Sequence, residues 1–220
     1  MIKKGIYFNE THSYYDLNLI LSASEIPPAE PKTNYIDIPG ADSAADLTES
    51  HGEVKYSDRK CSFTFTMNPA DDLSNEAFEE KKTEISNLLN GKVCRITLDK
   101  DSAYYYQGRC TVSEYLSDRR LKQFVVTARV QPYKLKQNVT TVKATLSSTV
   151  QELTITNGRK SVVPSIECTN NNTVVKFGDA TFNLGAGKHK ILDIQFVEGK
   201  NKVAVSGSGT VTFAFQEGEL

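Results

Sequence analysis

Apolar side chains recur at every second position in several stretches of the chain, which is the period of a β-strand with one buried face. Residues 61–67 and 124–130 show the pattern best, with apolar side chains facing one way and mostly polar ones the other. The same reasoning predicts further strands at 6–8, 17–22, 34–38, 92–98 and 104–112. The first half of the chain is therefore predicted to form a β-sandwich.

One stretch, residues 75–89, has the period of an amphipathic helix. Ser74 or Asn75 can cap its N-terminus, and Asn90-Gly91 suits the left-handed turn that ends many helices. The apolar face is spaced by seven, three and one residues: Phe78, Ile85, Leu88 and Leu89. We expect this helix to cover one side or end of the sandwich.

Two stretches of the first 150 residues lack the regular spacing of apolar side chains. Residues 41–56 lack hydrophobic periodicity, which predicts a long irregular loop of a kind that usually binds a partner or moves. Residues 134–149 are polar and rich in threonine, and they are predicted to form a linker with a first edge strand. The first domain is therefore expected at 1–133 and the second at 150–220.

The second domain contains only short apolar runs separated by glycine-rich turns. Regular short strands with such turns are typical of an antiparallel sandwich. With fewer than about 85 residues the module has a thin core, which docking onto another surface would help to stabilise. The predicted strands are 153–155, 165–168, 174–177, 181–184, 191–196, 203–205 and 211–215.

The charge and hydropathy of the chain argue against nucleic-acid and membrane partners. The 220 residues include 26 Lys and Arg against 27 Asp and Glu, a formal net charge of -1. Nucleic-acid binding and polybasic membrane attachment both need concentrated positive charge, so neither is expected. The sequence shows neither a signal peptide nor about 18 consecutive apolar residues, so we expect synthesis and assembly in the cytosol, with no membrane partner.

The residues that usually carry chemistry are scattered. The four cysteines lie singly, mostly in apolar runs, and are predicted to be reduced and buried: Cys61, Cys94, Cys110 and Cys168. The three histidines are far apart, and no catalytic motif, cofactor motif or metal-ligand spacing is present. We therefore predict no catalytic, cofactor or metal residues.

Three weaker patterns have simpler explanations. Residues 185–189 resemble the end of a phosphate loop but lack its first glycine and its final hydroxyl, so a hairpin turn is expected. Asp118–Arg120 is expected to be a charged turn rather than a phosphate site. The acidic residues lack the spacing of a calcium loop and are expected to be solvated: Asp42, Asp46, Glu49, Asp71 and Asp72.

Tyr104 and Tyr106 are candidate surface aromatics. Adjacent strand residues point to opposite faces, so within the run 104–106 only these two share a face. Protein contact is the favoured interpretation, because tyrosine buries area while keeping a polar tip. Sugar stacking is the alternative, which the absence of tryptophan weakens.

Eight segments carry a resemblance to a known family: 31–49, 56–59, 63–65, 88–98, 104–109, 130–134, 157–160 and 207–213. They resemble the distal tail proteins of long, flexible-tailed phages and prophages of Gram-positive bacteria. The resemblance spans essentially the whole chain, and the run from Ile38 to Asp42 is its most specific part. Ser43 departs from the family, which often has glycine there.

This resemblance implies a virion protein at the tail tip. It implies an N-terminal sandwich with one helix, a galectin-like C-terminal sandwich and a homo-oligomeric, hexameric ring. The ring would connect the tail tube protein to the tail-associated protein and, in many phages, to receptor-binding proteins. The candidate contact residues lie in the predicted loop and just before it: Pro39, Gly40, Ala41, Asp42, Asp46, Leu47 and Glu49.

Three functions from different classes follow. A structural hub is favoured by the full-length resemblance and by the missing catalytic set. A carbohydrate-binding module that contacts the host surface is the alternative, suggested by the galectin-like fold and the tyrosines. An enzyme such as a cell-wall hydrolase has no residue in the sequence to support it.

Overall fold

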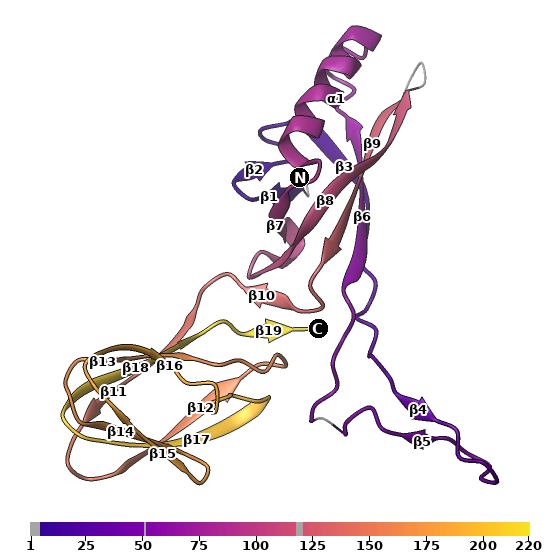
Figure 1. Ribbon diagram of the computed structural model, residues 1–220. Coiled ribbons are helices and arrows are strands. Elements are labelled where there is room, and N and C mark those ends of the chain that lie inside the picture. Colours follow the sequence, from indigo (N-terminus) through magenta and orange to yellow (C-terminus); the bar gives the residue numbers. More distant parts are fainter. Residues whose placement is uncertain (1–4, 51, 118–120) are drawn as a thin grey trace. The chain divides into compact units, whose positions relative to one another are not determined.

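The computed structural model describes residues 5–50, 52–117 and 121–220, and the chain divides into two compact units, Met1–Lys134 and Leu135–Leu220 (Figure 1). Both units consist mainly of antiparallel strands, and helix α1 is the single α-helix of the described residues. The predicted fold class, mainly β with one helix, is confirmed. Within the described ranges no helix has the length and hydropathy to cross a membrane.

The main antiparallel sheet of the first unit has the strand order β2-β1-β7-β8-β9-β6-β3. A 3-10 helix, Asp99–Asp101, connects β7 to β8. The strand bounds are Ile6–Phe8 (β1), Thr11–His12 (β2), Leu19–Glu25 (β3), Arg59–Met67 (β6), Val93–Leu98 (β7), Tyr104–Ser117 (β8) and Lys122–Val130 (β9).

This sheet folds back on itself, so that strands far apart in its order face each other across one core. Phe8 lies on β1, which is not a hydrogen-bonded neighbour of β6. Its ring nevertheless packs edge-on against Phe63 and Phe65 of β6, with centroid distances of 6.2 and 6.0 Å. Alternate residues of β6 and β9 point into the same core and are fully buried. The result is the predicted N-terminal sandwich.

Strands β8 and β9 approach each other unusually closely at Gly108, which pairs with Val130. A Cβ atom at this glycine would lie 2.2 Å from the carbonyl oxygen of Arg129 and 2.6 Å from the Cα of Val130. Both distances are far below van der Waals contact, so only glycine allows the two backbones to meet here.

Helix α1, Asn75–Leu89, has the predicted bounds and caps. The Ser74 hydroxyl accepts a hydrogen bond from the Ala77 backbone N–H at 3.2 Å, and Gly91 adopts the left-handed conformation with φ of 76°. The apolar face packs on the sheet, and its fully buried residues are Phe78, Ile85 and Leu89. The helix prediction is confirmed.

The second unit contains two four-stranded sheets, ordered β11-β18-β13-β16 and β12-β17-β14-β15. A separate core lies in this unit and includes Phe196, Phe213 and Phe215. The strand bounds are Thr140–Leu146 (β11), Gln151–Asn157 (β12), Ser165–Cys168 (β13), Thr173–Phe177 (β14), Ala180–Leu184 (β15), Gly187–Lys190 (β16), Gly199–Ser206 (β17) and Gly209–Phe215 (β18). Two short strands, β10 (Lys134–Lys136) and β19 (Gly218–Glu219), pair with each other.

One strand prediction in this unit is wrong. Residues 191–196 form a turn and a single bridge from Phe196 to Val162, whereas the strand lies just before them at β16. The Asn201 side chain amide donates to the Val197 carbonyl at 2.8 Å and accepts from the Val197 N–H at 3.0 Å. Asn157 donates to the Phe196 carbonyl at 3.1 Å. Phe196 thus bonds to the Val162 backbone, asparagine side chains hold the next residue, Val197, and Ile194 and Phe196 still fill the core.

The stretch 134–149 contains strands β10 and β11, and β11 lies at the edge of its sheet.

All four cysteines are free and buried, as predicted. Burial raises the pKa of the Cys61 thiol to about 11, so the thiol stays protonated at neutral pH.

Candidate protein-contact surface

Residues 31–56 form a two-stranded arm, where the sequence predicted an irregular loop at 41–56. Strand β4 (Tyr35–Ile36) pairs with β5 (Ala45–Asp46), and the strand predicted at 34–38 is present in this shorter form. The loop prediction is wrong for β5. Hydrophobic periodicity is missing here because the arm buries neither of its faces, although its backbone is paired.

The arm is fastened to the sheet at its base. Arg59 lies at the start of β6 and is only 6% exposed. Its guanidinium donates to the Pro132 carbonyl at 2.7 Å and to the Pro27 carbonyl at 3.4 Å, and it lies 5.7 Å from the centre of the Tyr106 ring. Pro27 comes just before the arm in the chain, and Pro132 comes just after β9. Arg59 therefore fixes the place where the chain leaves the sheet.

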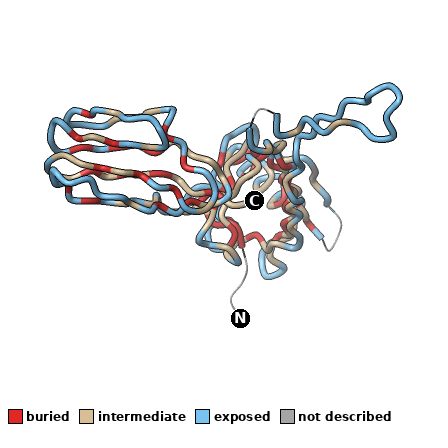
Figure 2. Tube along the Cα trace, turned by 90° about the horizontal axis from the view of Figure 1, so that it is seen from below, coloured by how far each residue is buried: buried red, intermediate tan, exposed pale blue. Residues whose placement is uncertain are grey.

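The arm has no core of its own. Figure 2 shows it exposed almost throughout, and none of its described residues is buried. Four large apolar side chains face solvent, with exposed fractions of 58% for Tyr35, 49% for Ile36, 51% for Ile38 and 38% for Leu47. A two-stranded hairpin alone is marginally stable in water. The arm is therefore an element that another surface would stabilise.

The seven predicted contact residues all lie on this arm. Pro39, Gly40, Ala41 and Asp42 belong to the connection between β4 and β5, where Gly40 has a φ of 85°. Asp46 lies in β5, and Leu47 and Glu49 follow it. The structure thus brings these residues together on one exposed element. Whether they contact a partner remains a prediction.

The outer part of the arm is acidic. Between Asp37 and Glu53 the sequence has five carboxylates and neither lysine nor arginine. Hydrogen bonds from the side chain and then the backbone of Thr48 lower the pKa of Asp46. Within the described ranges no group of His, Cys, Asp or Glu is placed to hold a metal ion. Of the five carboxylates, Glu53 forms an ion pair with Lys55 at 2.7 Å.

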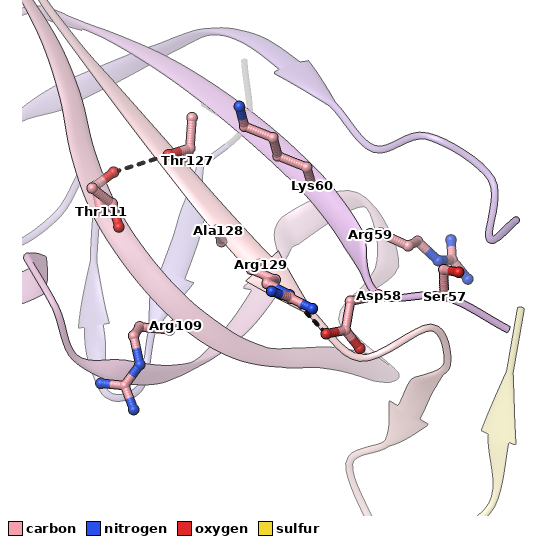
Figure 3. A pocket seen from close by; sticks show the side chains of 9 residues that line it. All are labelled: Ser57, Asp58, Arg59, Lys60, Arg109, Thr111, Thr127, Ala128 and Arg129. Carbon is pink, nitrogen blue, oxygen red and sulfur yellow. Dashed lines mark hydrogen bonds and ion pairs between the residues drawn. The ribbon is translucent and has the colours of Figure 1, made fainter.

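A shallow hollow of about 670 Å³ lies on the outer face of strands β6, β8 and β9 (Figure 3). Three cationic residues occupy opposite positions on these strands, because Arg129 pairs with Lys60 on one neighbouring strand and with Arg109 on the other. We call these three residues the cation row. Asp58 forms an ion pair with Arg129 at 2.8 Å and is the only carboxylate paired with the row in the described part of the chain.

The two candidate tyrosines differ in their surroundings. Tyr104 is partly exposed, and the Lys134 ammonium lies 4.6 Å from its ring centre. Tyr106 is only 8% exposed and belongs to the core, so its assignment as a surface aromatic is wrong. Its apolar ring fills the sandwich beneath the buried guanidinium of Arg59. A paired sugar-stacking platform is therefore not available at these positions.

Sequence reasoning missed a buried histidine that pairs with a partly exposed aspartate at the end of the first sheet. His12 is 1% exposed, and its Nε2 atom lies 3.2 Å from Asp99. The Nδ1 atom accepts the backbone N–H groups of Tyr14 and Tyr15 at 3.1 and 3.0 Å, so the proton belongs on Nε2. Both nitrogens are thus used in holding the loop, which is a structural role. The two residues are 87 positions apart, which no local pattern reveals.

The other weak patterns are resolved as follows. Residues 185–189 lead into strand β16, and His189 Nε2 lies 2.8 Å from the Gly185 carbonyl. The turn is present, but the predicted hairpin is wrong, because β15 and β16 belong to different sheets and do not pair with each other. The charged turn expected at 118–120 lies outside the described residues.

Comparison with solved structures finds the same fold over nearly the whole length of both chains. One matching structure is the crystal structure of Dit (gp 19.1) of SPP1, described as a paradigm of the hub adsorption apparatus in phages that infect Gram-positive bacteria. The match covers 97% of this chain and 98% of the SPP1 chain, with a TM-score of 0.68 and 12% identity.

At this level of identity the likeness establishes the fold, and it confirms the resemblance to distal tail proteins at that level. Comparisons with family models and with curated proteins gave no match.

Proposed function

We propose that this chain is a structural component of a phage tail tip, a hub whose copies close into a ring. The observation that carries the proposal is the fold, which follows that of the SPP1 hub over nearly the full length of both chains. A likeness covering both units supports a role that uses both, rather than a single shared module.

The exposed arm supports assembly in particular. A closed ring is built from heterologous contacts, so each copy needs two different complementary surfaces. The arm offers apolar side chains that its own chain leaves in water, and an acidic outer part. Such an element gains most of its stability only when a neighbour covers it.

In the proposed virion the ring has six copies. It joins the tail tube protein to the tail-associated protein and also contacts receptor-binding proteins. The chain is made and assembled in the cytoplasm of the host bacterium. The proposed role is mechanical and needs no catalytic residue, cofactor or nucleic acid.

The test is the mass of the purified full-length chain in solution. Light scattering coupled to size-exclusion chromatography should give a species of six times the 24.4 kDa of one chain. Negative-stain images of the same fraction should show rings. A monomer at every concentration, also when the tail-associated protein is added, would contradict the proposal.

Deleting residues 43–53 tests the arm. The deletion removes β5 and no buried described residue, so the far-ultraviolet circular dichroism should keep the strand signal of the sandwich. The ring should dissociate at concentrations where the complete chain is assembled. An unchanged mass profile would remove the arm from the interface.

A further inference from the structure

The cation row is an electrostatic anomaly within its own chain. Lys60, Arg129 and Arg109 lie directly opposite one another on three adjacent strands, and like charges in that position destabilise a sheet. Arg129 is 78% exposed, and the ammonium of Lys60 has no hydrogen-bond or ion-pair partner among the described residues. One aspartate, Asp58, leaves the row with a surplus of positive charge.

The complementary charge lies on the arm. Asp37, Asp42 and Glu49 form no ion pair or side-chain hydrogen bond with any described residue. The same segment carries the exposed Ile38 and Leu47. The arm thus presents carboxylates and apolar side chains together.

The surface around the row has the same mixture. Strand β7 places Val93 directly opposite Arg109, and Val93 is exposed. The hydroxyl-bearing side chains of Thr111 and Thr127 line the rest of the hollow (Figure 3). An acidic segment with a few apolar side chains therefore fits this face better than a uniformly charged polymer.

From this match we infer that the cation row is the surface that receives the acidic arm of a second copy of this chain. The inference rests on the proposed ring and names one of its contacts: the arm of one copy lies across strands β6, β9 and β8 of the next. Because ion pairs on open surfaces are individually weak and screened by salt, the contact acts through several charges at once.

A pair of reciprocal charge reversals tests this. The row variant Lys60→Glu with Arg109→Glu leaves Arg129 between two carboxylates, so the sheet loses its internal repulsion and the melting temperature should not fall. Its assembly constant should nevertheless drop more than about tenfold, because the arm now meets negative charge. The arm variant is Asp37→Lys with Asp42→Lys and Glu49→Lys, and it should fail to assemble for the same reason.

Mixing the two variants is the decisive measurement. Each variant has a row and an arm of the same sign, but the arm of one matches the row of the other. A 1:1 mixture should therefore form an alternating ring, and so should a chain that carries all five substitutions. Rings should weaken as sodium chloride rises from 50 to 500 mM for the unsubstituted chain and for the mixture alike.

The outcomes separate this inference from the proposed function. An unsubstituted ring with an unaffected row variant overturns the inference and leaves the hub intact. Loss of assembly in both variants without rescue by mixing also overturns it, since the charges would then not meet. Row-dependent binding of inorganic polyphosphate by a ring that salt does not weaken would assign the row to a polyanion instead. An unsubstituted chain that stays monomeric overturns both proposals.

Discussion

Two hairpins of this chain illustrate different sources of stability. The hairpin of β14 and β15 has five paired positions, from Thr173–Leu184 to Phe177–Ala180, and it lies in one layer of the second sandwich. The arm hairpin of β4 and β5 has two paired positions and no buried residue. The backbones of both hairpins are paired, so the two hairpins differ in whether their side chains are buried. A hairpin that lacks burial within its chain depends on burial elsewhere.

The largest effect on stability is expected from truncating a side chain in the core on which the β14–β15 hairpin packs. Phe213 is fully buried and lies against Phe196 with a centroid distance of 6.1 Å. Phe213→Ala should lower the free energy of unfolding of the second unit by about 3–5 kcal/mol. Urea unfolding followed by circular dichroism measures the loss. A loss below about 1 kcal/mol would mean that the sandwich is not held by this core.

The attachment of the arm should be the next most sensitive point. Arg59→Met removes the donors to the Pro132 and Pro27 carbonyls and should cost about 1–3 kcal/mol in the first unit. Lys60→Met is the matched control, since the neighbouring side chain is exposed, and it should change the stability by less than about 0.5 kcal/mol. Equal losses for the two variants would show that Arg59 does not anchor the arm.

Alkaline pH should weaken the buried core and leave the arm unaffected. The Cys61 thiol has a pKa of about 11 in the folded chain, against an ordinary value of 9.0, because burial disfavours the thiolate. The unfolded chain loses this proton first, so stability falls as pH rises above 9, by about 1 kcal/mol between pH 8 and pH 10. Urea midpoints at both pH values measure the slope, which Cys61→Ala should reduce. A slope unchanged in that variant would assign the effect to other groups.

Relief of repulsion in the cation row should produce a smaller effect of opposite sign. Lys60→Glu replaces a like-charge neighbour of Arg129 by an attractive one and should stabilise the first unit by about 0.2–1 kcal/mol. Lys60→Thr should give part of this gain. Thermal unfolding at low salt measures both variants, and a destabilised Lys60→Glu chain would contradict the repulsion.

The smallest effect is expected on the arm itself. Ile36→Ser with Leu47→Ser should leave the stability of the isolated chain within about 0.5 kcal/mol, because both side chains are already exposed. Val175→Ser in β14 is the buried counterpart and should cost several times more. If the arm variant were as unstable as the β14 variant, the arm would have a core after all.

The sequence predicts elements well where burial and local signals agree. Helix α1 has the predicted bounds because Ser74 and Gly91 supply both caps and one face packs on the sheet. Residues 191–196 look like a strand because Ile194 and Phe196 are buried, yet they form a turn followed by the single bridge from Phe196 to Val162. Burial of alternate side chains gives the pattern of a strand even where the backbone is not paired as one.

The candidate surface was predictable only in outline. The seven candidate contact residues were proposed from an aperiodic segment and the family resemblance, but the pairing of that segment was missed because β4 and β5 bury nothing. Tyr106 was misassigned because the apolar period of β8 does not tell which face is covered. The cation row could not be predicted, because its members Lys60, Arg109 and Arg129 are far apart in the sequence and only the strand register brings them together.

Gly108 has a consequence for this register. Its bare Cα lets the backbones of β8 and β9 nearly touch, one position before Arg109 meets Arg129. Any side chain there would push the two strands apart and widen the gap between the backbones at Arg109 and Arg129. A single missing methyl group thus keeps positive charge concentrated on a surface that has almost no acid of its own.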